Sequence, residues 1–141
     1  GGGGANEIAS CAKRTIIIVN HDLRRFPPRV DYITSPGYLD GSKDARQKAG
    51  LIGNGPSKVI TDLAVMDFDQ ETYRMRLLSL HPGTTIDEVQ KRTGFELLVA
   101  PDLKETIPPS SEELRVLREE VDPTGFYIKR RAERKAVRAA T

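Results

Sequence analysis

The sequence contains few of the residues that supply redox chemistry, metal ligation or aromatic stacking. Its 141 residues include one cysteine, two histidines and no tryptophan, and aromatic residues make up only 6%. A single cysteine cannot form an intrachain disulfide, so the protein does not require an oxidising compartment. Cys11, His21 and His81 lack the close spacing of metal ligands. We therefore expect no metal site.

Long hydrophobic runs are also missing. No apolar stretch approaches the roughly 20 residues that a membrane-spanning helix needs, and the first residues do not follow the basic-then-apolar pattern of a signal peptide. Apolar residues make up 38% and charged residues 30%, as in a globular protein that forms its own core. These features predict a cytoplasmic protein that does not associate with membranes.

The excess of positive charge is concentrated near the end of the chain. The formal net charge is only +2, and the basic run consists of Lys129, Arg130, Arg131, Arg134, Lys135 and Arg138. Such a run can bind nucleic acid or an acidic partner. No aromatic side chain interrupts it, however, as base stacking would require. We predict a domain over residues 1–128, a solvated basic tail over 129–141, and no nucleic acid partner.

Four consecutive glycines open the chain and precede a short stretch with helical spacing at Ile8 and Cys11. Glycines leave room for a ligand, and the backbone N–H groups at a helix N-terminus can bind an anion. We expect a glycine loop that leads into a helix capped by Asn6 and holds a negative charge or a developing oxyanion. The alternative is that the glycines are a flexible linker or the remnant of a purification tag.

The remaining pattern alternates strands with helices, which predicts an α/β fold. Residues 15–20 are a β-branched run typical of a strand buried on both faces. Two short strands at 58–61 and 64–68, a turn at 69–72 and a strand at 74–80 read as a hairpin unit. We further expect extended segments at 29–34 and 95–99, a helix from Thr84 or Thr85 to Arg92, and a helix over 112–121 capped by Ser110 or Ser111.

Other candidate residues have simpler interpretations. Residues 39–55 read as a long surface segment with at most one helical turn, near residues 44–48. We expect Cys11 to be a small buried residue, and Asp62, Asp67 and Asp69 to be turn or edge residues. These patterns predict one oxyanion-binding corner and do not identify a reaction.

Several motifs nevertheless match a known family in order. The sequence resembles the C-terminal half of the B subunit of the family I CoA-transferases, of the glutaconate CoA-transferase kind, from residue 1 to about residue 128. The motifs that carry the resemblance lie at residues 1–10, 20–26, 30–37, 59–62, 66–68, 81–83, 93–95 and 118–123.

The resemblance implies an open, mostly parallel sheet with flanking helices, lacking the N-terminal part of the family fold. It implies a reaction in which an acyl-CoA thioester is attacked by a glutamate from the early part of the B subunit. That glutamate lies upstream of the glycines in the family, so no catalytic nucleophile is expected in this chain. Coenzyme A would take part as the acyl-CoA substrate. The implied partners are the A subunit, together with a segment equivalent to the N-terminal half of the B subunit, in a hetero-oligomer.

The resemblance also implies site residues. The amides of the glycine segment would face the thioester carbonyl, with a second turn near the cleft. The residues concerned are Gly2, Gly3, Gly4, Ala5 and Asn6 for the first group, and Ser35, Pro36 and Gly37 for the second. Some members of the superfamily hydrolyse or decarboxylate CoA thioesters, and this activity is one alternative. A non-catalytic subunit or structural fragment is the other.

Overall fold

The computed structural model describes residues 2–128, which fall into two compact units divided between Thr106 and Ile107. The first unit contains α1 (Gly3–Cys11), β1 (Thr15–Ile18), α2 (Ala45–Lys48), β2 (Pro56–Ile60), β3 (Ala64–Phe68), β4 (Met75–Leu80), α3 (Ile86–Lys91) and β5 (Leu98–Glu105). The second contains α4 (Ser111–Val116) followed by the π-helical turn η1 (Leu117–Val121). The predicted basic tail, residues 129–141, lies outside the described residues.

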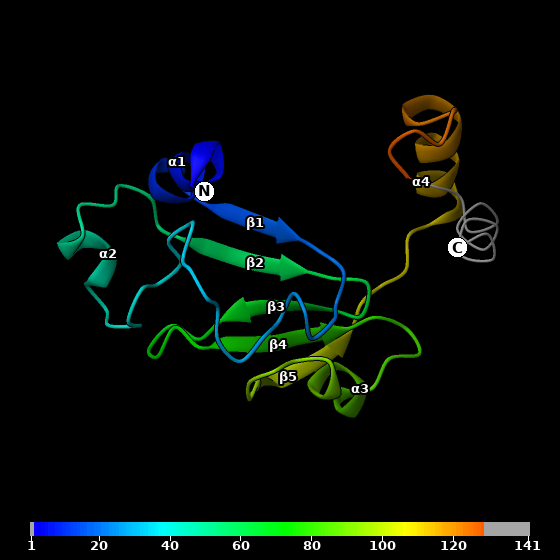
Figure 1. Ribbon diagram of the computed structural model, residues 1–141. Helices are drawn as coiled ribbons and strands as arrows, with labels where there is room; N and C mark the ends of the chain where they lie inside the picture. The colour runs from blue at the N-terminus through cyan, green and yellow to red at the C-terminus, as the bar shows by residue number, and fades with distance from the viewer. Residues whose placement is uncertain (1, 129–141) are drawn as a thin grey trace. The chain divides into compact units, whose positions relative to one another are not determined.

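The five strands form one open sheet in the order β1-β2-β3-β4-β5 (Figure 1). The outer pairs β1/β2 and β4/β5 are parallel, whereas β2/β3 and β3/β4 are antiparallel. The α/β class and the open sheet are therefore confirmed, but the sheet is mixed rather than mostly parallel. The reason is the hairpin unit predicted from residues 58–80, because short turns join only antiparallel strands.

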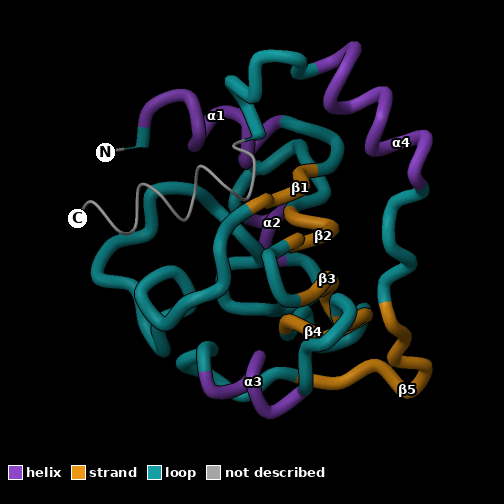
Figure 2. The backbone as a smooth tube through the Cα atoms, turned by 90° about the vertical axis from the view of Figure 1, so that its right-hand side faces the viewer, coloured by secondary structure: helices purple, strands orange, loops and turns teal. Residues whose placement is uncertain are grey.

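The hydrophobic core covers one face of the sheet. Along β3, residues Ala64, Met66 and Phe68 are buried and alternate with half-buried Val65 and Asp67, as the two-residue period of a strand requires. The loop after β1 and helix α3 pack on the buried face and contribute Phe26 and Val89. Figure 2 shows the strands in order from β1 to β4.

Strand β1 differs from its prediction. It pairs only with β2 among the described residues, so it forms an edge of the sheet. Its isoleucines are exposed: 51% for Ile16, 43% for Ile17 and 80% for Ile18. The expectation of a strand buried on both faces was wrong for the described chain, because no described segment covers these side chains on either face of the sheet.

Local turn and cap signals were more reliable. Thr85 caps α3 by accepting a hydrogen bond from the backbone N–H of Glu88, and Ser110 forms a complete capping box with Glu113 at α4. Residues 29–34 form no strand, and the strand expected at 95–99 begins only at Leu98. Across residues 2–128, no helix is both long enough and apolar enough to cross a membrane.

Candidate active site

The predicted glycine corner is the N-terminus of helix α1. The helix begins at Gly3, so Gly3 and Gly4 belong to its first turn instead of a preceding loop. No side chain caps this end, and the first turn contains no acidic residue. The first backbone N–H groups of a helix have no partner within the helix and carry its partial positive charge. This end of α1 can therefore bind an anionic oxygen.

Asn6 does not cap the helix as expected. It lies inside α1, and its side-chain amide donates a hydrogen bond to the backbone carbonyl of Thr34 at 2.8 Å. The tertiary contact replaces the local capping interaction. It also places α1 beside the turn Ser35, Pro36 and Gly37, whose three residues are half-buried. The structure thus brings the two groups of predicted site residues together.

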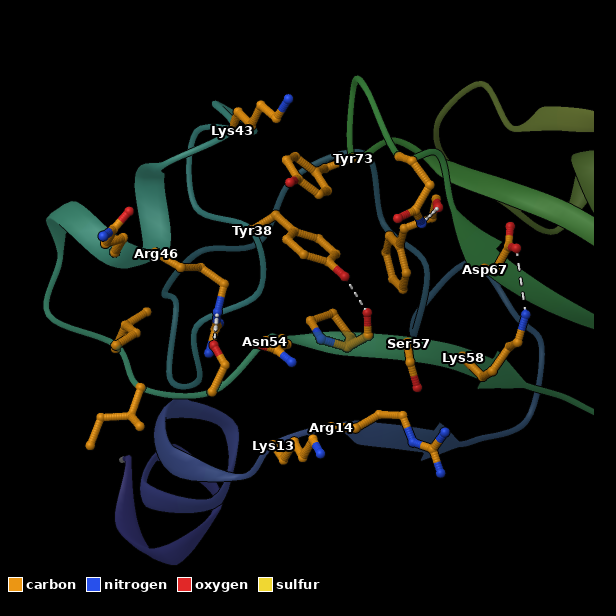
Figure 3. Close-up of a pocket in the computed structure, with 18 of the residues that line it drawn as sticks. Lys13, Arg14, Tyr38, Lys43, Arg46, Asn54, Ser57, Lys58, Asp67 and Tyr73 are labelled. Carbon is orange, nitrogen blue, oxygen red and sulfur yellow. Dashed lines mark hydrogen bonds and ion pairs between the residues drawn. The ribbon is translucent and has the colours of Figure 1, made fainter.

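A buried arginine, Arg46, strengthens the connection between α1 and this turn. Its guanidinium group donates hydrogen bonds to the carbonyl of Ala9 in α1 at 2.9 Å, of Gly37 at 2.6 Å and of Gly53 at 2.8 Å. Figure 3 shows Arg46 reaching from α2 towards the segment ahead of β2. Arg46 is not among the residues predicted from the sequence, because nothing in a short polar helix indicates which side chain is buried.

The glycines differ in how far the fold itself requires them. Gly3 has a φ of +56°, which favours glycine. A Cβ on Gly2 would lie 3.3 Å from Cβ of Asn6, a close contact. Gly4 has neither constraint, because a Cβ there would meet nothing within 4 Å. The folding of the described chain therefore gives no reason for glycine at position 4.

The other chemically interesting residues lie elsewhere or have structural partners. Cys11 is exposed, so its prediction as a small buried residue was wrong. His21 is buried with its ring nitrogens 3.1 Å from Thr61 Oγ1 and 2.9 Å from Thr93 Oγ1. Burial lowers the pKa of His21 despite the charge of Asp62. Residues 2–128 contain no group of His, Cys, Asp or Glu arranged to hold a metal ion.

Comparison with known proteins identifies the family to which this fold belongs. The family model described as Coenzyme A transferase matches residues 1–92. In the crystal structure of glutaconate CoA-transferase from Acidaminococcus fermentans, the matched region superimposes with a TM-score of 0.82 and 39% identity, covering 92% of this chain and 49% of that one. The chain belongs to the Coenzyme A transferase family.

Individual relatives have related but distinct names. The B subunit of glutaconate CoA-transferase from A. fermentans is 40% identical over 129 residues, covering 91% of this chain and 47% of the relative. The B subunit of 3-oxoadipate CoA-transferase from Pseudomonas knackmussii is 41% identical, with coverage of 84% and 45%. The cholesterol ring-cleaving hydrolase IpdB subunit of Rhodococcus jostii is 37% identical, with coverage of 73% and 40%. The chain thus spans less than half the length of these relatives.

Proposed function

We propose that this chain is part of a CoA-transferase that moves CoA between an acyl-CoA thioester and a carboxylic acid of the glutaconate or 3-oxoacid type. The observation that carries the proposal is the uncapped, glycine-built start of α1 in a chain of this family. The similarity to the B subunits of glutaconate and 3-oxoadipate CoA-transferases supports the same reaction type.

In the proposed mechanism, α1 stabilises negative charge during thioester attack. A glutamate carboxylate attacks the thioester carbonyl carbon, and the carbonyl oxygen becomes negatively charged as the tetrahedral intermediate forms. The carbon–sulfur bond then breaks and leaves an acyl anhydride and a CoA thiolate. The thiolate attacks the glutamyl carbonyl of the anhydride, which releases the donor carboxylate and forms a glutamyl-CoA thioester. The acceptor carboxylate attacks this thioester in turn, and the CoA thiolate that is released then takes the acceptor's acyl group from the new anhydride and frees the glutamate. We assign the backbone N–H groups of Gly2, Gly3 and Gly4 to the developing oxyanion. Ala5 and Asn6 lead from this group into the helix, and Ser35, Pro36 and Gly37 lie beside the same cleft.

The nucleophilic glutamate comes from outside this chain in our proposal, because the similarity covers the C-terminal half of the B subunit. A segment equivalent to the N-terminal half would pair with the free edge of β1 and cover its exposed isoleucines. The A subunit would complete the site in a hetero-oligomer. Light scattering of the purified 141-residue chain tests this arrangement. A folded, monodisperse monomer with no affinity for either partner would contradict it.

Two glycine variants of the assembled enzyme test the proposed oxyanion site. Gly3→Val should lower acyl-CoA turnover by about a hundredfold, the usual scale for losing one such donor. Its strained backbone also costs about 1–3 kcal/mol of folding free energy. Gly4→Ala separates the effect on turnover from the effect on folding, because alanine favours a helix over glycine by about 0.5–1 kcal/mol. This variant should therefore reduce turnover without lowering the melting temperature.

Glu7→Ala provides the matched control for these variants. Glu7 is exposed on the same helix, beyond the first turn, so its loss should leave turnover within a few-fold. Turnover and melting temperature are measured on the same preparations. Normal turnover in folded Gly3→Val and Gly4→Ala enzymes would exclude the oxyanion role of α1.

Hydrolysis of a CoA thioester is the second candidate function, favoured by the 37% identity to the IpdB hydrolase subunit. The assay that separates the candidates follows both free CoA and the acyl-CoA of an added acceptor acid. Transfer yields the new acyl-CoA and requires the acceptor, whereas hydrolysis releases CoA with water alone. If the assembled complex turns over no acyl-CoA tested, a non-catalytic role for this chain becomes the better interpretation.

A further inference from the structure

A positively charged pocket lies in the first unit, and it is lined by residues that follow the end of α1 opposite the glycines. Its cavity volume is about 1180 Å³. We define this basic pocket by Lys13 and Arg14 after α1, Tyr38, Arg46 in α2, Lys58 in β2 and Tyr73. Because α1 has 9 residues at 1.5 Å each, it separates Lys13 from the proposed oxyanion site by about 13 Å.

The charges in this pocket are not balanced within the described chain. Asp67 is the one carboxylate among its described lining residues, and it already binds Lys58 at 3.4 Å and Arg76 at 2.9 Å. Although burial opposes it, hydrogen bonding to Arg76 holds the pKa of Asp67 below its ordinary value. Lys13 and Arg14 form no ion pair with any residue of the described chain. A concave surface with one sign of charge concentrates ligands of the opposite sign.

The backbone that carries these cations is firmly held. Gly53 donates a hydrogen bond to the carbonyl of Ser10 at 2.9 Å, and Asn54 donates one to the carbonyl of Lys13 at 3.3 Å. A Cβ on Gly53 would lie 2.2 Å from the carbonyl oxygen of Ala12, so only glycine permits this packing. The two basic side chains therefore extend from an ordered segment, and binding requires little reorganisation of the backbone.

An aromatic wall completes the pocket. The rings of Tyr38 and Tyr73 stack with centroids 4.5 Å apart, and the Tyr38 hydroxyl donates to the carbonyl of Pro56 at 2.5 Å. Figure 3 shows the two rings across β2 from Lys13 and Arg14. Tyr73 is half-buried and offers apolar surface to a ligand. A pocket lined by both cations and aromatic rings suits a molecule that combines a phosphate with a ring system.

We propose that the basic pocket binds the phosphates of a nucleotide, with Lys13 and Arg14 as the main phosphate contacts and Tyr73 beside the base. The nucleotide is either the adenosine phosphate portion of CoA or a free nucleotide. The proposal does not depend on the transfer reaction, because it follows from the charge and shape of this pocket.

Isothermal titration calorimetry of the full chain in its natural assembly tests the proposal with ADP, adenosine 3′,5′-bisphosphate, inorganic phosphate and adenosine as probes. The two phosphorylated nucleotides should bind, more weakly as salt increases, and adenosine should not bind measurably. Lys13→Gln combined with Arg14→Gln should weaken ADP binding by about tenfold or more, because two charge-assisted contacts are lost. These side chains are exposed, so the fold should survive.

Arg24→Gln combined with Lys91→Gln is the matched control. Both residues are exposed, lie outside the pocket lining and give the same change in net charge. ADP affinity in this control should stay within a factor of two. Absence of ADP binding to the unmodified protein, or equal affinity in the two double variants, would overturn the proposal. The proposal would also be overturned if the pocket variant kept its ADP affinity and lost only a protein partner, as judged by size-exclusion chromatography.

Enzyme kinetics distinguish the two sources of the nucleotide. If the pocket holds part of CoA, the pocket variant raises KM for acyl-CoA by a similar factor, and ADP competes with acyl-CoA. If it holds a free nucleotide, KM is unchanged and ADP does not compete. If the unmodified assembled enzyme shows no transferase activity but binds ADP, the proposed function is contradicted and the nucleotide proposal is still supported.

Discussion

Helices α1 and α3 begin in opposite ways. Helix α3 starts with Thr85, whose hydroxyl accepts the N–H of Glu88, and has two acidic residues in its first turn. Helix α1 starts with glycines, has no side-chain cap and contains no acidic residue in its first turn. Because the cap accepts a hydrogen bond at the start of α3, the N–H group that donates it is not available to a ligand. The start of α1 is less stable on its own but leaves those groups free for a ligand.

The difference between the two helix starts can be removed by giving α1 the negative charge that it lacks. Gly2→Asp places a carboxylate at the helix N-terminus, where it would compete with the oxyanion for the same N–H groups. We expect kcat of the assembled enzyme to fall by about a hundredfold. Gly2→Asn is the control, because it has nearly the same size without the charge. Equal loss in both variants would mean that steric crowding against Asn6 explains the effect.

A second variant loosens the anchor of α1 instead of its end. Arg46→Met removes three hydrogen bonds and leaves the carbonyls of Ala9, Gly37 and Gly53 without this donor. The free energy of unfolding should fall by about 2–3 kcal/mol, measured by denaturant titration. Lys48→Met on the same helix removes only an exposed ion pair with Asp44 and should cost less than about 1 kcal/mol. Comparable losses would show that Arg46 does not hold α1 in place.

The cap of α3 gives a smaller effect. Thr85→Ala should cost about 1 kcal/mol of unfolding free energy, because the N–H of Glu88 loses its acceptor. Turnover should be unaffected, since the proposed oxyanion site lies at the start of α1. Thr84→Ala is the neighbouring control and makes no cap. A large loss of activity in Thr85→Ala would show that a satisfied helix start can also matter for catalysis.

The smallest expected effect is a dependence on pH through His21, which packs on the same core as α3. Burial holds the pKa of His21 below its ordinary value of 6.5, so the folded protein resists protonation of this ring. The unfolded chain takes up the proton below pH 6.5, and stability therefore falls as pH decreases through that value towards the folded pKa. His21→Gln should reduce the dependence of the unfolding free energy on pH in this range. If the slope of unfolding free energy against pH is unchanged in the variant, other groups are responsible for it.

Interactions between residues that are close in the sequence could be predicted, whereas contacts between distant residues could not. The caps at Thr85 and Ser110 and the turn at Asp69 follow rules that act over three or four residues. The turn was predicted directly, and each cap was predicted as one of two neighbouring residues, Thr84 or Thr85 and Ser110 or Ser111. Asn6 was predicted as a cap by the same rules. Its actual partner, Thr34, is 28 residues away, and no local pattern reveals such a contact.

The sheet illustrates the same limit. The β-branched run at residues 15–20 was predicted as a strand, and the structure forms it over Thr15–Ile18, but the exposure of its side chains depends on which distant segments pack against it. Strand β5 contains Pro101, which argues against a central strand; the structure places it at the opposite edge of the sheet. Arg46 was unpredictable for a related reason, since its three acceptors come from distant segments.

The three acceptors of Arg46 also have a consequence for the order of folding. The carbonyls of Ala9, Gly37 and Gly53 come from well-separated parts of the chain, so α1 cannot be anchored until the long segment between β1 and β2 has closed. The β3/β4 hairpin needs no such closure and can form early. Under native conditions, the amide hydrogens of α1 should therefore exchange with solvent sooner than those of β3. The part of the molecule proposed to bind the thioester would then be the last to assemble and the first to open.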